Sequence, residues 1–235
     1  MLLLAFSRER HTLTTRDLSD ATGVPLPSVY RYVTLLRELG LLIGDGRGRY
    51  HLSARLTALA RAAEAAEPLH TIADPVMRRL ATQTGETVIL VRLVAGSATC
   101  VHRVESGYRL RISFEPGQQL PLLRGASARL LLASMPEEAR QQQLAPLARQ
   151  DPQAAAELAM RVAAAQRDGW AVSEEEIDRG VFAVSAAVRD SAGIVAALTV
   201  PSPLTRAPAG IQGELLDRVL AAAGEINEAL RAAHR

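Results

Sequence analysis

The sequence predicts an α+β protein in two parts, a small one of short helices with a β hairpin and a larger one with an antiparallel sheet. Before residue 53, apolar residues recur at helical spacing in two short segments and a strand–turn–strand pattern follows. From residue 68 onward, helical segments and paired strand patterns mix without the alternation that a parallel sheet requires. We expect three regions, residues 1–53, 54–66 and 67–235.

Composition narrows the class of protein. The 235 residues are 48% apolar and 22% charged, which is typical of a globular chain, and no apolar run approaches the ~20 residues that span a membrane. With a single cysteine, Cys100, neither disulfides nor a cysteine metal site are expected, and the histidines lack ligand spacing. Phosphate-loop and dinucleotide motifs are absent. We therefore expect a cytoplasmic protein without metal or cofactor and without a membrane partner.

The first region has the pattern of a helix–turn–helix. Residues 1–7 are expected to form a short first helix. Thr14 or Thr15 can cap the next helix, and Gly23 stands where the turn needs a positive φ. A further helix is expected over about Pro27–Leu39, with a buried stripe of Val29, Val33 and Leu36.

A hairpin follows, with strands at residues 41–44 and 49–52 and a turn of two glycines between them. Two helices and a hairpin in this order form a winged helix–turn–helix, which commonly places its second helix in the major groove of DNA. Residues 1–60 hold eight arginines against five acidic residues, whereas the whole chain carries only +2. This mildly basic N-terminal region suits contact with phosphates.

The expected DNA contacts lie on the second helix, the wing and the start of the first helix of the motif. Ser28 can donate to a phosphate at a helix N-terminus, and Arg31 can read guanine in the major groove. Arg47 and Arg49 lie on the wing. The candidate DNA-binding residues are Thr14, Thr15, Pro27, Ser28, Arg31, Tyr32, Arg47 and Arg49.

Beyond Ser53 the pattern predicts an alanine-rich linker helix and then a mixed domain. Helices are expected near residues 68–85 and 125–135, from Pro136 onward, and near residues 154–167 and 211–232. Strands are expected near residues 86–94, 99–104, 110–114, 170–172, 181–188 and 194–200.

Several segments together resemble the isocitrate-lyase regulator (IclR) family of bacterial transcription factors. They are residues 23–31 in the winged region, Gly85-Glu86-Thr87-Val88, Leu120-Pro121-Leu122, Gly125-Ala126-Ser127-Ala128-Arg129, Gly169-Trp170, residues 173–176 with Gly180, and residues 185–190 with Gly193. The resemblance covers nearly the whole chain.

The resemblance implies a winged helix–turn–helix, a linker helix and a C-terminal GAF/profilin-like domain that binds a small effector. It also implies a homodimer or a dimer of dimers on a palindromic double-stranded DNA operator. Family members usually repress operons for small-molecule catabolism, commonly of organic or aromatic acids. A repressor of such an operon is therefore expected. Pro27 departs from the family, which usually has a basic residue there.

The effector pocket is expected at the start of the helix near residue 126. Small residues at a helix start leave backbone N–H groups open to a carboxylate, which Arg124 could pair with. At the positions where members that bind small oxo-acids have polar side chains, this chain has Ser173, Ala183, Thr199 and Pro201, which favours a larger or less polar acid than glyoxylate or pyruvate. The candidate effector-binding residues are Ile112, Leu120, Leu122, Arg124, Gly125, Ala126, Ser127, Ser173, Glu174, Ala183, Ser185 and Thr199.

Two other classes remain open at this point. Cys100 and His102 are two apart on an expected strand and would share one face, so a hydrolase or acyl-transfer enzyme using Cys100 or a serine is the first alternative. A half-buried strand with a small apolar residue and a surface histidine explains the same pair. The second alternative is a sensory module whose winged domain binds protein instead of DNA.

Overall fold

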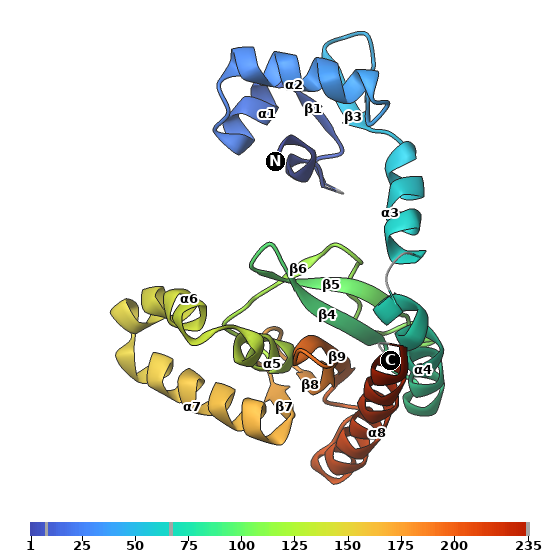
Figure 1. Cartoon of the computed structure of the whole chain (residues 1–235), viewed down its shortest axis with the longest axis vertical. Helices are drawn as coiled ribbons and strands as arrows, with labels where there is room; N and C mark the ends of the chain where they lie inside the picture. Colours follow the sequence, from blue (N-terminus) through green and yellow to red (C-terminus); the bar gives the residue numbers. More distant parts are fainter. Residues whose placement is uncertain (8, 66–67, 234–235) are drawn as a thin grey trace. The chain divides into compact units, whose positions relative to one another are not determined.

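The computed structural model describes residues 1–7, 9–65 and 68–233 and divides into two compact units, Met1–Glu67 and Pro68–Arg235 (Figure 1). The α+β class is confirmed. Helix α3 lies in the segment where a linker helix is expected, and Ala66 at its expected end lies outside the described residues. The boundaries at residues 53 and 66 stay predictions.

The N-terminal unit is a winged helix–turn–helix with a small antiparallel sheet in the order β1-β3-β2. The short first helix predicted over residues 1–7 is only a 3-10 turn, and strand β1 was not predicted because three residues carry too little pattern to mark it. The elements are η1 (Leu2–Ala5), β1 (Thr12–Thr14), α1 (Thr15–Thr22), α2 (Leu26–Glu38), β2 (Leu42–Gly44), β3 (Arg49–Leu52) and α3 (Arg55–Ala65).

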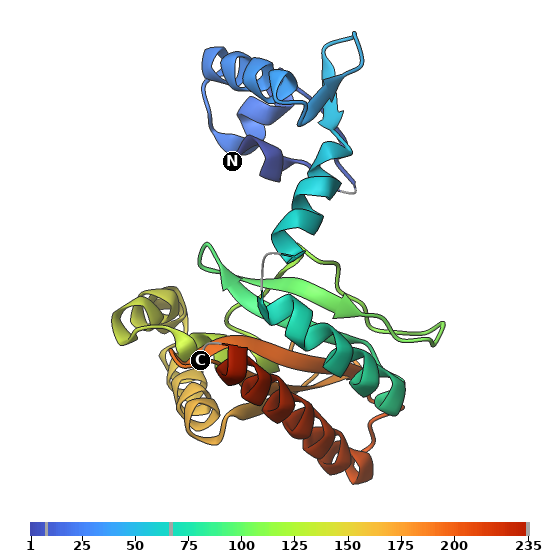
Figure 2. The same ribbon diagram turned by 45° about the vertical axis from the view of Figure 1, so that its right-hand side comes forward.

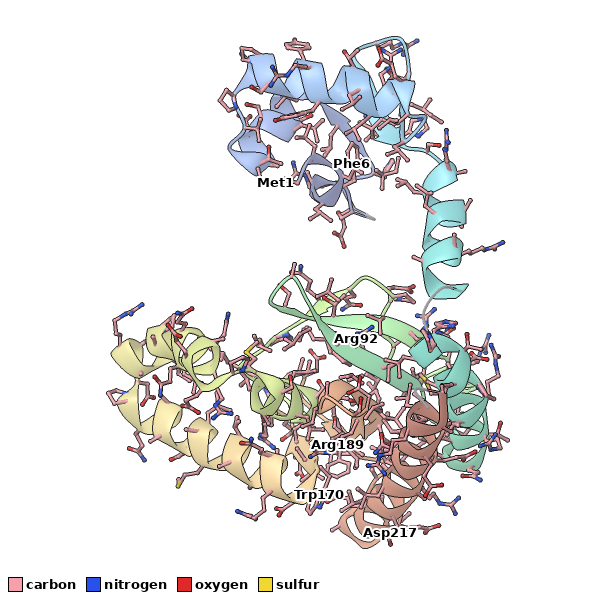
Figure 3. All side chains as sticks on the ribbon, in the orientation of Figure 1. Met1, Phe6, Arg92, Trp170, Arg189 and Asp217 are labelled. Carbon is pink, nitrogen blue, oxygen red and sulfur yellow. The ribbon has the colours of Figure 1, made fainter. Side chains whose placement is uncertain are left out.

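One apolar core holds the winged unit together. Leu18 of α1 and Val29 of α2 are fully buried, and Phe6 packs in the same cluster after η1 (Figure 3). Gly23 ends α1 at φ 68, which is why the turn needs glycine. Thr14 caps α1 in a capping box with Asp17. The hydrogen bond from the Thr14 backbone N–H to the Asp17 carboxylate is the main cause that lowers the pKa of this carboxyl, and the bond from the Thr14 hydroxyl adds to it.

The C-terminal unit is built on one six-stranded antiparallel sheet in the order β6-β5-β4-β9-β8-β7. Two hairpins, β4–β5 and β8–β9, join through the pairing of β4 with β9, where Ile89 lies opposite Thr199. The strands are β4 (Val88–Val94), β5 (Ser97–Val104), β6 (Gln119–Leu120), β7 (Trp170–Glu174), β8 (Val181–Arg189) and β9 (Ile194–Pro203).

Helices cover both faces of this sheet (Figure 2). Helices α4 and α8 pack side by side on one face over the largest apolar cluster, and α5 packs on the other face with α7 behind it. Successive side chains of β8 and β9 point to opposite faces of the sheet, so each face has its own apolar cluster. Val184 and Leu198 face α4 and α8, while Ala183 and Ala197 face α5. The helices are α4 (Pro68–Thr84), α5 (Ala126–Ser134), α6 (Glu137–Gln150), α7 (Pro152–Asp168) and α8 (Ala209–Ala233).

The strand expected at residues 110–114 is wrong. That segment is irregular, and the strand beside β5 is β6, five residues further on. Side-chain contacts, and not the backbone hydrogen bonds of a β-sheet, fix this segment. Arg103 donates to Ser113 Oγ at 2.7 Å and lies 3.1 Å from the Glu115 carboxylate. Alternating apolar residues predict a strand only where a neighbouring strand is available to pair with them.

The shared face expected for Cys100 and His102 is also wrong. The register of β4 and β5 shifts between Leu90 and Val91, so that His102 pairs with Leu90 and Cys100 with Val91. The extra residue of this β-bulge turns the two side chains apart. Cys100 is buried in the cluster next to α5, whereas His102 Nε2 lies 2.8 Å from the Asp74 carboxylate of α4.

Among the residues that the structure describes, none of the helices has the length and apolar character needed to cross a bilayer.

Candidate functional site

The exposed face of α2 carries the expected DNA-reading residues. Arg31 is exposed to solvent and lies beside exposed Tyr30, while Val29 and Val33 hold the opposite face of the helix in the core. Thr34 shares this exposed face, and its hydroxyl donates to the carbonyl of Tyr30. Tyr30 was not among the expected contacts, although its helical position one turn from Pro27 and Thr34 places it on the same face.

Two of the expected DNA-binding residues, Thr15 and Tyr32, are placed less favourably for contact with DNA than Arg31. The Thr15 side chain is buried, so it is not free to reach a phosphate. Tyr32 lines an apolar groove of about 340 Å³ together with Val24, Leu35 and the η1 leucines, although its ring also lies 5.6 Å from the Arg31 guanidinium. Ser28 is partly exposed in the first turn of α2, and Pro27 is exposed before it.

The wing presents its arginines from a rigid turn. Asp45 Oδ1 accepts the backbone N–H groups of Arg47 at 2.8 Å and Arg49 at 3.1 Å, and the first of these bonds most strongly lowers the pKa of the Asp45 carboxyl. Both arginine side chains are exposed. The carboxylate therefore orders the backbone of the turn and leaves both guanidinium groups open to an anionic partner.

The C-terminal unit encloses a small cavity between α5 and the sheet, which we call the sheet cavity. Its volume of about 30 Å³ has room for water but not for a larger ligand. The walls are mostly apolar, with hydroxyl groups at a few points. It is lined by Ile89, Phe114, Leu120, Ala126, Ser127, Ser173, Glu176, Ile177, Asp178, Val181, Ala183, Thr199 and Pro201.

Half of the expected effector residues line this cavity, and the rest lie elsewhere. Leu120, Ala126, Ser127, Ser173, Ala183 and Thr199 are in its walls. Ser185 lies behind it, fully buried, with its hydroxyl 2.7 Å from that of Thr199. Ile112 and Leu122 are outside the walls, and Arg124 lies instead on a neighbouring groove. Gly125 is the residue before α5 and contacts the cavity wall through Ile177.

Glu176 and Asp178, not Glu174, are the acidic residues that line the cavity. Glu174 is exposed at the end of β7. The Glu176 carboxylate accepts the Gly125 N–H at 2.9 Å and pairs with Arg129, whose side chain is 8% exposed. Three consecutive glutamates could not be told apart in the sequence, because only the geometry of the β7–β8 turn decides which of them points inward.

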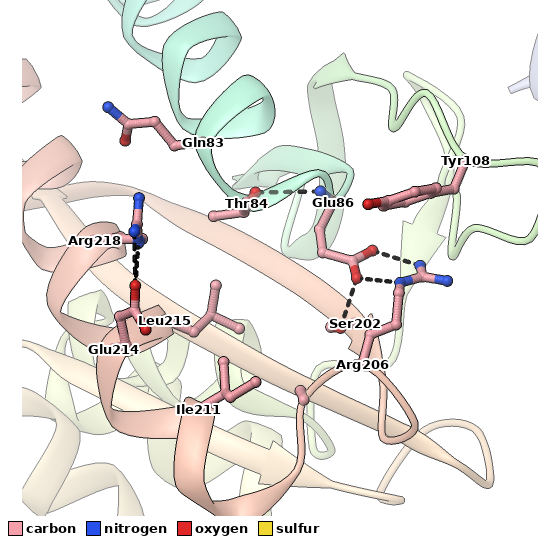
Figure 4. A pocket seen from close by; sticks show the side chains of 11 residues that line it. Gln83, Thr84, Glu86, Tyr108, Ser202, Arg206, Ile211, Glu214, Leu215 and Arg218 are labelled. Carbon is pink, nitrogen blue, oxygen red and sulfur yellow. Dashed lines mark hydrogen bonds and ion pairs between the residues drawn. The ribbon is translucent and has the colours of Figure 1, made fainter.

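A second cavity of about 310 Å³ lies between α4, the start of α8 and the loop carrying Tyr108 (Figure 4). Glu86 is buried there, its carboxylate paired with Arg206 through contacts of 2.6 and 2.7 Å and accepting from Ser202 Oγ at 2.9 Å. The Arg206 guanidinium lies 4.9 Å from the centre of the Tyr108 ring. Because each charge in this wall has a partner within the wall, the arrangement is that of a structural ion pair.

Cys100 is poorly suited to nucleophilic catalysis. Its side chain is fully buried, and this burial raises the pKa of the thiol to about 11. Its Sγ donates to the backbone carbonyl of His102 at 3.4 Å, and the imidazole of His102 is directed to Asp74 instead. A thiolate, the reactive form, is therefore scarce at neutral pH.

We expect Cys100 to react with Ellman's reagent at least about 100-fold more slowly in the folded protein than in concentrated urea, because both burial and the raised pKa suppress the thiolate. The measurement is the absorbance of the released thiolate, with free glutathione in the same two solutions as a control for the solvent. Equal rates for the folded and unfolded chain would contradict the buried placement.

A winged helix–turn–helix on the same chain as a sheet domain with a cavity is typical of DNA-binding transcriptional regulators that have an effector-binding domain. Residues 62–228 match the family model described as bacterial transcriptional regulator IclR C-terminal, and residues 1–46 match the IclR helix-turn-helix domain. The chain belongs to the IclR family of transcriptional regulators.

Similar proteins carry related names. The HTH-type transcriptional regulator KipR of Bacillus subtilis is 29% identical over 80% of this chain and 77% of its own length. The HTH-type transcriptional regulator Rv1719 of Mycobacterium tuberculosis is 30% identical, over 89% of this chain and 82% of its own. The fold matches that of an IclR homolog from Microbacterium hydrocarbonoxydans, solved with 4-hydroxybenzoate, with a TM-score of 0.81 and 23% identity over 98% of this chain and 96% of that one.

Proposed function

We propose that this regulator represses an operon for the breakdown of a small organic or aromatic acid, and that the acid binds in the sheet cavity and releases the DNA. The observation that carries the proposal is the wall of that cavity. Apolar side chains of Ile89, Phe114 and Leu120 surround a few hydroxyl groups, next to the N-terminus of α5 and Arg129. The apolar wall suits the hydrophobic body of such an acid, and Arg129, which pairs with the lining residue Glu176, is the cation next to the cavity.

The likeness to the Microbacterium hydrocarbonoxydans protein, solved with 4-hydroxybenzoate, supports an aromatic acid. The composition of the wall supports it as well, since Ala183 and Pro201 offer no polar side chain to a small oxo-acid. Double-stranded DNA with a palindromic operator, a homodimer or dimer of dimers, and a cytoplasmic location complete the proposal. Residues 1–53 would bind the operator, residues 54–66 would link the domains, and residues 67–235 would bind the effector.

The test uses the full-length protein and a fluorescent duplex from the region upstream of its own gene. Binding is followed by fluorescence anisotropy at one fixed salt concentration. It is measured first without a ligand and then with increasing concentrations of 4-hydroxybenzoate, benzoate or uncharged benzamide. The proposal expects saturable binding to this duplex and release by an acid but not by benzamide. Failure to prefer this duplex over a scrambled one, or equal release by benzamide, would overturn it.

Changing Arg31 to alanine should weaken operator binding by about 1–3 kcal/mol and leave binding to the scrambled duplex nearly unchanged, because a guanine contact is lost. Changing Arg49 to alanine should weaken both by a similar factor and reduce the dependence on salt, because a phosphate contact is lost. Arg149→Ala, an exposed arginine of α6, is the matched control. Equal losses on both duplexes for Arg31→Ala would contradict its role as a reader of sequence.

A further inference from the structure

The turn between β7 and β8 places one carboxylate against the start of α5. Glu175 has a φ of 54, and its side chain accepts the Gly180 N–H at 2.7 Å, so the turn is held by its own bonds. The next residue, Glu176, thereby reaches the Gly125 N–H at 2.9 Å. Ile177 follows and lies directly over Gly125, where an added Cβ would meet its Cδ1 at 2.7 Å.

The surroundings of the Glu176 carboxylate are those of an anion site. The Gly125 N–H, which donates to this carboxylate, and the N-terminus of α5 favour a negative charge, and the guanidinium groups of Arg129 and Arg161 pair with it. Arg129 is 92% buried in its side chain, which costs free energy unless an anion stays beside it. Its Nε is buried without a hydrogen-bond partner, so this arginine retains an unused donor among the described residues.

Glu176 also separates two spaces. On one side is the sheet cavity of about 30 Å³. On the other is a groove of about 370 Å³, which we call the arginine groove because Arg124, Arg129 and Arg161 line it together with Glu157 and Glu176. Glu176 lines both spaces, and Ile177 lines the sheet cavity. The sheet cavity is too small for an aromatic ring as it stands, so a ligand of that size requires this wall to move.

We propose that Glu176 is a built-in substitute for the carboxylate of the effector. The incoming acid takes its place on Arg129 and the Gly125 N–H, Glu176 and Ile177 move outward, and the sheet cavity then opens to the arginine groove. This inference rests on the proposed effector site. One carboxylate replaces another, so Arg129 never loses its anion during the exchange, whereas a neutral ligand would leave it unpaired.

The exchange predicts that acids bind in preference to neutral analogues. It also predicts that the effector binds less tightly than its contacts alone would allow, because part of its binding free energy is spent in displacing Glu176. Removing the internal carboxylate should therefore leave an anion site that a small external carboxylate can fill.

The experiment measures thermal unfolding of the full chain in sodium acetate and in sodium chloride at equal ionic strength. Glu176→Ala should unfold at a lower temperature than wild type, and acetate at 100 mM should raise its midpoint by about 2–4 °C relative to chloride, saturably. Glu175→Ala is the matched control, because it removes a carboxylate and a hydrogen bond from the same turn without touching an arginine. Neither it nor wild type should respond to acetate.

Glu176→Gln is measured in parallel, because it keeps the shape of the side chain if the alanine variant does not fold. It should also gain a response specific to acetate. If neither Glu176 variant is stabilised by acetate over chloride, or if Glu175→Ala responds equally, the proposal is overturned.

The outcome is independent of the proposed function, because acetate stabilisation requires neither DNA nor the natural effector. If acetate stabilises the Glu176 variants while no acid releases DNA from wild type, the proposed function fails and the anion site stands. If acids release DNA from wild type, Glu176→Gln should respond at an acid concentration about tenfold lower. An unchanged or higher concentration would overturn the displacement step.

Discussion

Changing Glu86 to glutamine should lower the free energy of unfolding of the C-terminal unit by about 3 kcal/mol, or about 6–12 °C in its melting temperature. The Glu86 side chain is 5% exposed and that of its partner Arg206 is 25% exposed. The substitution keeps a hydrogen-bonding group near Ser202 but removes the charge that raises the pKa of Arg206, mainly through their hydrogen bonds. The partly buried Arg206 is left without its anion, and this uncompensated charge is what destabilises the folded state when a buried pair is broken.

The matched control lies in the wall of the same cavity. Glu214 pairs with Arg218 one helical turn away at 2.6 Å, but the two side chains are 62% and 39% exposed. Solvent screens such a pair, so Glu214→Gln should change stability by less than about 0.5 kcal/mol. Urea unfolding followed by circular dichroism measures both variants. If they lose equal stability, the buried pair is not the stabilising element described here.

Replacing Gly125 with alanine should lower stability by about 3 kcal/mol and abolish release of DNA by the effector. Gly125 has φ 90 and ψ 166, a conformation that is essentially restricted to glycine. The new Cβ would also lie 2.7 Å from Ile177 Cδ1, so the β7–β8 turn would have to move away from α5. Stability is measured by urea unfolding and the response by anisotropy of labelled operator DNA.

The Gly117→Ala variant separates the effect of backbone strain on stability from the effect of the contact with Ile177. Gly117 has a φ of 87, but an added Cβ there meets no atom within 4 Å, so only backbone strain of about 1–2 kcal/mol is expected. Adding Ile177→Ala to Gly125→Ala should restore part of the stability by making space for the methyl group. A Gly125→Ala protein that is no less stable than Gly117→Ala would show that the contact with Ile177 has no energetic weight.

The sequence predicted the winged unit well because its signals are local. The apolar spacing of Val29 and Val33 defines the buried face of α2, and Gly23 marks the turn by its need for a positive φ. Most strands and helices of the larger unit were also predicted from periodicity, and the spacing of short motifs carried the resemblance to the family that the comparisons confirm.

The parts that could not be predicted depend on contacts between distant segments. The bulge beside Val101 moves His102 to the face of α4, and nothing in the residues 99–104 marks it. Glu176 is distinguished from Glu174 only by the bonds that shape its turn and by Gly125, some 50 residues earlier. Arg124, expected beside Gly125 in the pocket, lines the arginine groove and not the sheet cavity.

The pairing of β4 with β9, which joins the two hairpins, affects how the protein folds during its synthesis. Ile89 and Thr199 pair across about 110 residues of intervening chain, so this contact forms late and slows folding relative to the two local hairpins. The same two residues lie side by side in the sheet wall of the sheet cavity. A chain still emerging from the ribosome therefore has its complete winged unit before it has this cavity, which forms only after β9 has been synthesised and has paired with β4.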